Sequence, residues 1–239
     1  MSAYGKIAAP VRTTGEPLVP RTYPLPRRGA ALTVFPCNRE TVSNELIEYL
    51  ASVFNDVVEE GRTYPQQEKL SFDEFAAYFF GADCFVGLLD VAPAELGDAS
   101  SGLDREAGYS IDSVRAGRDW KECVLGMYYV KPNYPGRSSH NCNGGFVVPN
   151  HHRGLRVGST LGRSYLHFAP LLGYRGSVFN LVYVSNEASV RIWDGLGFKR
   201  AGLIPKAGCL KSRTEGGEDE YVDAIVFHYD FTEGKPEKQ

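Results

Sequence analysis

The sequence has few of the features that mark membrane proteins or nucleic-acid-binding proteins. It has no apolar run near the roughly 20 residues that a membrane span requires. Its charges nearly cancel, with 26 basic and 29 acidic residues and a net charge of −3 at pH 7, which argues against general nucleic-acid binding. With 239 residues, 43% of them hydrophobic, the chain can bury a core without disulfide staples. We therefore expect a globular protein with neither a membrane nor a nucleic-acid partner.

Cysteine is also scarce, and its spacing excludes common cysteine-based sites. The five cysteines include no Cys-x-x-Cys pair, and most lie in apolar or strand-like runs where a free thiol acts as a small hydrophobe. The five histidines show no fixed metal-ligand spacing either. We therefore expect no disulfide framework, no metal and a reducing compartment.

The first 30 residues combine several prolines with an excess of basic side chains. The basic bias resembles a mitochondrial transit peptide, but the prolines interrupt any amphipathic helix. No signal-peptide apolar region follows Met1. We predict an extended, partly disordered arm over residues 1–30 and a cytoplasmic location, with a mitochondrial location as the alternative.

Hydrophobic periodicity predicts one α/β domain with a mixed sheet over residues 31–231. Residues 93–119 have little periodicity and are expected to form a surface insertion, and residues 232–239 a frayed tail. The expected strands are 31–37, 84–91, 123–130, 143–148, 177–184, 202–210 and 222–231, and the expected helices are 40–61, 71–80, 157–172 and 186–196.

A loop between a strand and a helix carries the first chemical signal, at Arg153-Gly154-Leu155-Arg156-Val157-Gly158-Ser159. The first N–H groups of a helix lack internal partners and favour anions. The two glycines allow close approach of a phosphate, and the two arginines add positive charge. The loop is neither a Walker loop nor a Gly-x-Gly-x-x-Gly motif. It predicts a pyrophosphate site, with a solvated basic loop as the alternative.

A second segment, Asn186 to Phe198, follows an apolar strand and contains Ser189, Trp193 and the turn Gly197-Phe198. Together the two segments resemble the acetyl-CoA motifs of the GNAT N-acetyltransferase superfamily, although most members have Gly at the position of Arg156. The resemblance implies a GNAT fold, with a mostly antiparallel central sheet flanked by helices. It implies acetyl-CoA as co-substrate, no metal, and cofactor contacts from Val147, Val148, residues 153–159, Asn186, Ser189 and Trp193.

Further segments resemble one fungal group within this superfamily, the azetidine-2-carboxylate N-acetyltransferases. They are Gly61–Pro65, Lys131–Tyr134, Ser139–Asn143, Ala169–Tyr174, Phe179–Val182 and Pro205–Gly208. The resemblance implies direct acetyl transfer, through a ternary complex, to a small cyclic secondary amino acid such as a proline analogue. Detoxification, a role in oxidative stress and a homodimer are implied in the same way.

Acetyl transfer to an amine requires donors for a developing oxyanion and a neutral amine held against the thioester. The fungal resemblance implies that Asn143 and Asn180 bind or polarise the substrate and that Asn186 acts near the thioester. Tyr64 and Phe146 are expected to supply apolar walls. Alternatively, Asn180 bonds neighbouring backbone at a sheet irregularity, and Asn186 only caps a helix. No clear Glu base is present, so a water held by the asparagines is a candidate proton acceptor.

Two other functions compete with this hypothesis. One is a GNAT enzyme for a different amine, such as a polyamine, an aminoglycoside, another amino acid or a protein amine. The other is a CoA-binding module without catalysis, which would lack converging asparagines.

Overall fold

The protein is described here from a computed structural model, which covers residues 9–12, 15, 17–25, 30–90, 105–108, 110–214 and 216–233. The chain divides into two compact units. The first unit is formed by residues 1–16, 130–144 and 165–239, and the second by residues 17–129 and 145–164. Strands β5 and β6 and helix α5 contribute residues to both units.

The second unit consists of strands covered by helices. Its strands are, in the order in which they lie side by side, β4 (Arg105–Glu106), β1 (Arg21–Leu25), β2 (Ala30–Cys37), β3 (Asp83–Asp90), β5 (Val124–Pro132) and the end of β6 (Asn141–Val147). Its helices are α1 (Asn44–Glu60), α2 (Phe72–Phe79), α3 (Ile111–Arg115), α4 (Trp120–Cys123) and the start of α5 (Val157–Leu171).

Local sequence signals explain where α1 and α2 begin and end. Ser43 caps α1 by accepting a hydrogen bond from the N–H of Leu46, and Gly61 ends it with φ 66°. Ser71 and Glu74 form a capping box at the start of α2. Both helices direct apolar faces into one cluster with side chains of β2, β3 and β5. This packing fixes the chain that leads from α1 towards Tyr64.

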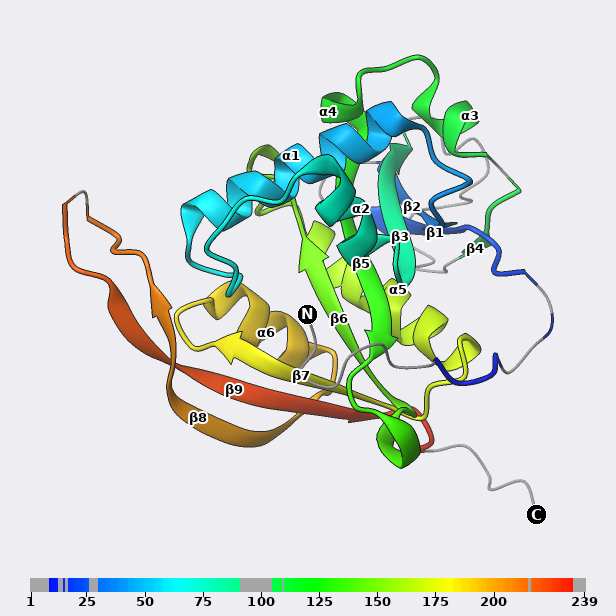
Figure 1. The fold of residues 1–239 in the computed structure, drawn as a ribbon. Helices are drawn as coiled ribbons and strands as arrows, with labels where there is room; N and C mark the ends of the chain where they lie inside the picture. Colours follow the sequence, from blue (N-terminus) through cyan, green and yellow to red (C-terminus); the bar gives the residue numbers. More distant parts are fainter. Residues whose placement is uncertain are drawn as a thin grey trace. The chain divides into compact units, whose positions relative to one another are not determined.

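The first unit contains the start of β6, followed side by side by β7 (Gly176–Tyr183), β9 (Glu220–Asp230) and β8 (Lys199–Leu210). β6 and β7 pair in parallel, whereas β9 is antiparallel to both β7 and β8. Helix α6 (Glu187–Gly195) connects β7 to β8, which forms a long hairpin with β9 (Figure 1). The α/β fold class with a mixed, mostly antiparallel sheet is thus confirmed.

The expectation of an extended arm differs from the structure at residues 21–25. These residues form β1, which pairs with β2, and the side chains of Tyr23 and Leu25 are buried. Pro24 is tolerated because β4 pairs only with Arg21 and Thr22 among the described residues, so the Pro24 position needs no donor on that side. Most of the remaining arm lies outside the described residues.

The expected surface insertion also differs from the structure over residues 105–119. β4 pairs with β1, and Val114 on α3 is buried in the core cluster. Arg115 lies over the ring of Trp120 at 4.0 Å, and Arg118 donates a hydrogen bond to the carbonyl of Leu89 at 2.7 Å. This part of the segment therefore packs on the second unit; residues 91–104 and 109 lie outside the described residues, as do 234–239 of the tail.

Within the described part of the chain, no helix has both the length and the apolar character needed to cross a bilayer.

Candidate active site

The glycine- and arginine-containing loop lies where the sequence predicts it, directly before α5 in the second unit. A short 3-10 turn, Asn150–His152, leads into it, and α5 begins at Val157. Gly154 has φ 79° and Arg156 has φ 63°, both in the left-handed region. These two residues turn the chain so that the N-terminal N–H groups of α5 follow the loop directly. The arrangement fits an anion such as a pyrophosphate, because these groups and the helix dipole are both positive.

Arg156 occupies a backbone conformation that favours glycine. Its φ of 63° explains why glycine is expected at this position. The Arg156 carbonyl accepts hydrogen bonds from the Ser159 hydroxyl at 2.9 Å and the Thr160 hydroxyl at 3.0 Å, which tie the loop to the first turn of α5. The guanidinium is exposed and has no ion-pair partner among the described residues. It is therefore available to an anion at the loop.

Arg153 is already engaged with an acidic partner that the sequence analysis did not identify. Its guanidinium makes two hydrogen bonds, at 3.0 and 2.9 Å, to the carboxylate of Glu60 in the last turn of α1. Both side chains are partly exposed, so the pair is screened by water. Glu60 reduces the positive charge that Arg153 was expected to offer and joins the loop to α1. A pairing between residues 93 positions apart leaves no local signal in the sequence.

Two of the expected cofactor residues can offer only their main chain. The side chains of Val147 and Val157 are each 2% exposed and belong to the packed interior. Val148, Leu155, Gly158 and Ser159 are partly exposed, and Gly154 is exposed. The structure therefore supports main-chain contacts for this segment rather than a side-chain surface.

Tyr64 and Phe146 were expected to line one pocket, but they lie on opposite faces of β6. A Cβ atom on Gly145 would lie 2.6 Å from the Tyr64 hydroxyl, so Tyr64 covers the Gly145 face. Phe146, the next residue, points the other way and stacks on Tyr128 with ring centroids 5.0 Å apart. Within the described part of the chain, the Tyr64 hydroxyl donates to the main-chain carbonyl of Phe146, at 3.4 Å, and to no other group. The two side chains therefore cannot be walls of the same pocket.

Tyr64 lies near two other tyrosines, Tyr78 and Tyr129, in the second unit. The hydroxyls of Tyr78 and Tyr129 are hydrogen-bonded at 3.0 Å, and the Gln66 amide donates to Tyr78 at 3.3 Å. Burial raises the pKa of Tyr64 and that of Tyr129 well above the ordinary value. Tyr64 and Tyr129 are therefore neutral donors at physiological pH and not bases.

In the first unit, Asn180 lies at an irregularity of β7, where the register against β9 shifts between Phe179 and Val182. Its amide pairs reciprocally with that of Asn133: Asn133 Nδ2 donates at 3.1 Å and Asn180 Nδ2 donates back at 2.6 Å. The Tyr134 hydroxyl donates to the same Asn180 oxygen at 3.3 Å. The irregularity was anticipated, but the partners are side chains rather than neighbouring backbone.

Asn143 and Cys142 take opposite faces of β6, as the strand period predicts. The Cys142 thiol is fully buried and hydrogen-bonded to the Tyr165 hydroxyl at 3.0 Å. Asn143 is partly buried, and its side-chain amide has no hydrogen-bond partner among the described residues. Both its donor and its acceptor are therefore available to a ligand.

Asn186 and Trp193 have structural roles that are clear from their contacts. The Asn186 side chain caps α6 by accepting from the N–H of Ser189 at 3.2 Å. The Ser189 hydroxyl in turn accepts from the indole N–H of Trp193 at 2.9 Å. Trp193 is 4% exposed, and its ring centroid lies 4.5 Å from that of Phe179. Its side chain therefore belongs to the core and does not face a cofactor.

No cluster of His, Cys, Asp or Glu with the makeup of a metal site occurs within the ranges that the structure covers.

The comparisons with known proteins place the chain in a family. No family model matches it. N-acetyltransferase aca1 of Schizosaccharomyces pombe is 41% identical over 187 residues, which are 78% of this chain and 81% of that protein. This chain belongs to the N-acetyltransferases, in the same family as aca1. Protein SPT10 of Saccharomyces cerevisiae is 32% identical over 208 residues, covering 78% of this chain but only 31% of the longer protein.

Solved structures agree on the fold of this N-acetyltransferase. A GCN5-related N-acetyltransferase from Kribbella flavida superposes with a TM-score of 0.60 at 22% identity, covering 83% of this chain and 97% of that one. A phosphinothricin acetyltransferase from Sinorhizobium meliloti, in complex with AcCoA, gives 0.59 at 14% identity over 83% and 88%. As an N-acetyltransferase, the enzyme transfers an acetyl group to an amine.

Proposed function

We propose that this N-acetyltransferase acetylates a small cyclic secondary amino acid, such as azetidine-2-carboxylate, a related proline analogue or a pyrroline-5-carboxylate-type metabolite. The observation that carries the proposal is the neutral amide group of the first unit. The Asn143 amide has no protein partner in the described chain, and the Asn180 amide is held by Asn133 and Tyr134. Amides can bond both the carboxylate and the amine of an amino acid without bringing a net charge.

The loop before α5 is proposed to bind the pyrophosphate of acetyl-CoA. Gly154 and Arg156 set its turn, and Gly158 and Ser159 lie in the first turn of the helix. The exposed Arg156 guanidinium adds charge, whereas Arg153 holds the loop through Glu60. The main chain of Val147 and Val148 is proposed to pair with the amides of pantetheine.

For the reaction, Asn143 and Asn180 are proposed to hold the carboxylate and the reacting carbonyl by N–H donation. The neutral amine then attacks the thioester directly in a ternary complex, and the thiolate leaves. Asn186 keeps its cap on α6 and is proposed to face pantetheine with its remaining N–H groups. The amine proton is proposed to pass to water held by the asparagines.

Steady-state kinetics test the proposal directly. Thiol release is measured over azetidine-2-carboxylate, other proline analogues, spermidine, an aminoglycoside and an N-terminal peptide. Asn143→Ala should lower kcat by about 10²–10³-fold if its amide serves the oxyanion. If it serves only ground-state binding, KM should rise and kcat should persist. A wild-type enzyme that prefers spermidine or the peptide would replace this substrate with the alternative amine.

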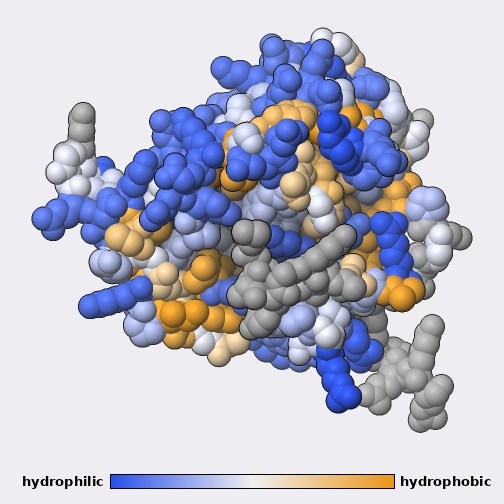
Figure 2. Space-filling view, in the orientation of Figure 1, coloured by the Kyte–Doolittle hydropathy of each residue, from blue (hydrophilic) through white to orange (hydrophobic). Residues whose placement is uncertain are grey.

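A homodimer is also proposed, with the β8–β9 hairpin as the contact. β8 pairs on one side only among the described strands, and an edge strand can pair with another chain. Leu203 and Ile204 are exposed at 56% and 41%, and apolar side chains gather over this hairpin in Figure 2. Light scattering should give twice the chain mass for wild type and a monomer for Leu203→Glu.

We propose a cytoplasmic location, with mitochondria as the alternative.

A further inference from the structure

The strongest unassigned feature is the reciprocal amide pair in the first unit, formed by Asn133, which directly follows β5, and Asn180 on β7. The two amides exchange hydrogen bonds of 3.1 and 2.6 Å. Both side chains are partly buried, and the Tyr134 hydroxyl adds a third bond, of 3.3 Å, to the Asn180 oxygen. Asn133 itself is fixed by its main chain, because its N–H donates to the carbonyl of Asn141 at 2.9 Å.

This pattern determines which hydrogen bonds Asn180 can still make. An amide oxygen has two lone pairs, and here Asn133 and Tyr134 use both. The amide nitrogen has two N–H groups, and Asn133 uses one. What remains is one N–H, for which the described residues offer no acceptor. Asn180 can therefore donate to a ligand but cannot accept from one.

The register shift in β7 explains why Asn180 needs support. Between Phe179 and Val182 the ladder to β9 is interrupted, so the Asn180 main chain lacks the regular pairing of its neighbours. The Phe179 ring on one side is fixed by stacking on Phe198 at 5.0 Å. The amide beyond it takes its orientation from Asn133 and Tyr134 instead.

We infer that Asn133 is a positioning residue, which with Tyr134 turns the Asn180 amide so that it presents one N–H to an oxygen of the substrate or of the reacting carbonyl. The inference rests on the proposed catalytic role of Asn180 and adds the direction of its hydrogen bond. It also specifies the ligand chemistry, because the partner of Asn180 must be an acceptor such as a carboxylate or an oxyanion. An ammonium group or an amine N–H would find no lone pair there.

The first test is a double-mutant cycle with the amine that wild type acetylates fastest. Asn180→Ala should lower kcat by about 10²–10³-fold. Asn133→Ala should lower it by about 10²-fold, because a displaced donor loses most of its effect. The double variant should be no slower than Asn180→Ala, since Asn133 acts through Asn180. Tyr134→Phe should cost about two- to tenfold, because the amide pair remains.

The second test asks whether Asn180 donates. Asn180→Asp keeps the shape but replaces the N–H with a carboxylate oxygen, so it should lose about as much kcat as Asn180→Ala. An active Asn180→Asp enzyme would show that the residue accepts a proton donor and would overturn the inference. So would additive losses in the cycle, or normal kcat in Asn133→Ala.

A structural asparagine provides the control. Asn55 makes two hydrogen bonds of 2.8 Å to the main chain of Leu70, so Asn55→Ala should lower the melting temperature without lowering kcat. If Asn133→Ala behaves like this control, its role is structural and the inference is wrong. If wild type releases no thiol with any amine, it is the proposed function that fails; an active wild type with a normal Asn133→Ala rejects only the positioning role.

Discussion

The backbone of Arg156 allows charge and strain in the pyrophosphate loop to be separated by two substitutions. Its φ of 63° lies in the left-handed region, and its side chain is exposed. Arg156→Gly and Arg156→Ala both remove the guanidinium, but only glycine adopts this backbone without a steric cost. The difference in stability between the two variants therefore measures the cost of the left-handed backbone. The change in the KM for acetyl-CoA that both variants share measures the effect of the lost charge.

The expected magnitudes follow from this geometry. A left-handed backbone costs a residue with a Cβ about 1–2 kcal/mol, and the greater freedom of glycine in the unfolded chain offsets about 0.5–1 kcal/mol of this. Arg156→Gly should thus be about 1 kcal/mol more stable than Arg156→Ala, which is about 2–4 °C in Tm for a chain of this size. One charge about 4 Å from a phosphate in water is worth about 1 kcal/mol, so both variants should raise the KM for acetyl-CoA about fivefold.

Thermal unfolding without ligand and acetyl-CoA kinetics measure the two effects. Arg191 supplies the control, because it lies exposed within α6. Its ion pair with Glu187 is lost equally in Arg191→Ala and Arg191→Gly. In a helix the order reverses, so Arg191→Ala should be more stable than Arg191→Gly by about 1 kcal/mol. Equal stability of the two Arg156 variants would refute the strained loop. An unchanged KM in both would remove Arg156 from the cofactor site.

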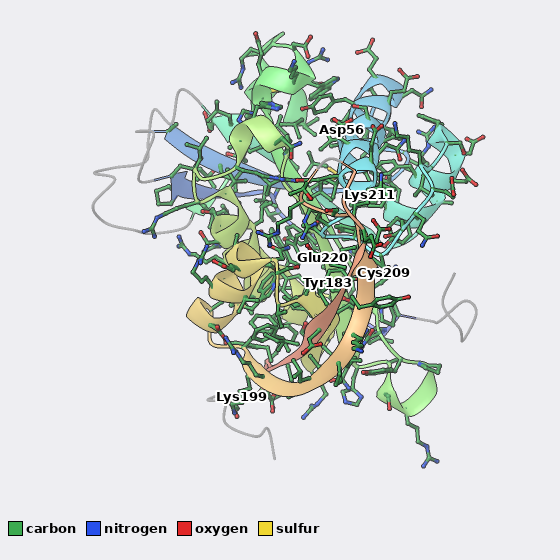
Figure 3. The ribbon with its side chains drawn as sticks, turned by 90° about the vertical axis from the view of Figure 1, so that its left-hand side faces the viewer. Asp56, Tyr183, Lys199, Cys209, Lys211 and Glu220 are labelled. Atoms are coloured by element: carbon green, nitrogen blue, oxygen red, sulfur yellow. The ribbon has the colours of Figure 1, made fainter. Side chains whose placement is uncertain are left out.

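Four further predictions test the core, the cofactor loop and the thiols. Trp120→Ala should lower the free energy of unfolding by about 3–5 kcal/mol in urea titrations, because Trp120 is 6% exposed and packed in the core cluster. A loss below about 1 kcal/mol would contradict this packing. Gly158→Leu should raise the KM for acetyl-CoA while circular dichroism stays native, and normal binding would reject the loop assignment. In the native protein one thiol should react with a maleimide, since Cys209 on β8 is the exposed cysteine and the other four are buried (Figure 3). Burial raises the pKa of Cys37 and of Cys142 to about 12. The unfolded chain therefore loses these protons at a lower pH than the native protein does, so the free energy of unfolding should fall as the pH rises above about 9. A free energy of unfolding that stays constant up to about pH 11 would contradict this burial.

The elements that the sequence predicted correctly are those with strong local signals. α1 has a continuous apolar stripe, a Ser cap and a terminal Gly, and β7 is a nearly continuous apolar run. β1 was missed because Pro24 and the basic residues of residues 1–30 indicate an irregular arm, while the pairing that makes it a strand lies in β2. The short helix α3 was missed because it has only one buried side chain, Val114, and therefore little apolar periodicity.

The candidate site was predictable where the main chain determines it. The glycines and the helix start at Val157 predicted the loop before α5, and strand alternation predicted the opposite faces of Cys142 and Asn143. Side-chain pairing was not predictable, because Arg153 with Glu60 and Asn133 with Asn180 join residues distant in sequence. Alternation also excludes a shared pocket for Tyr64 and Phe146, but only once the face that Tyr64 covers is known.

The candidate side chains of the first unit are neutral, and this bears on which amine the enzyme takes. They are the amides of Asn143 and Asn180. A polyamine or a basic peptide binds best to carboxylates, whose attraction repays part of the cost of desolvating its charges. Neutral donors instead suit the carboxylate of an amino acid and do not stabilise the charged form of its amine. An amine in such surroundings loses its proton more readily, and the free base is the form that attacks the thioester.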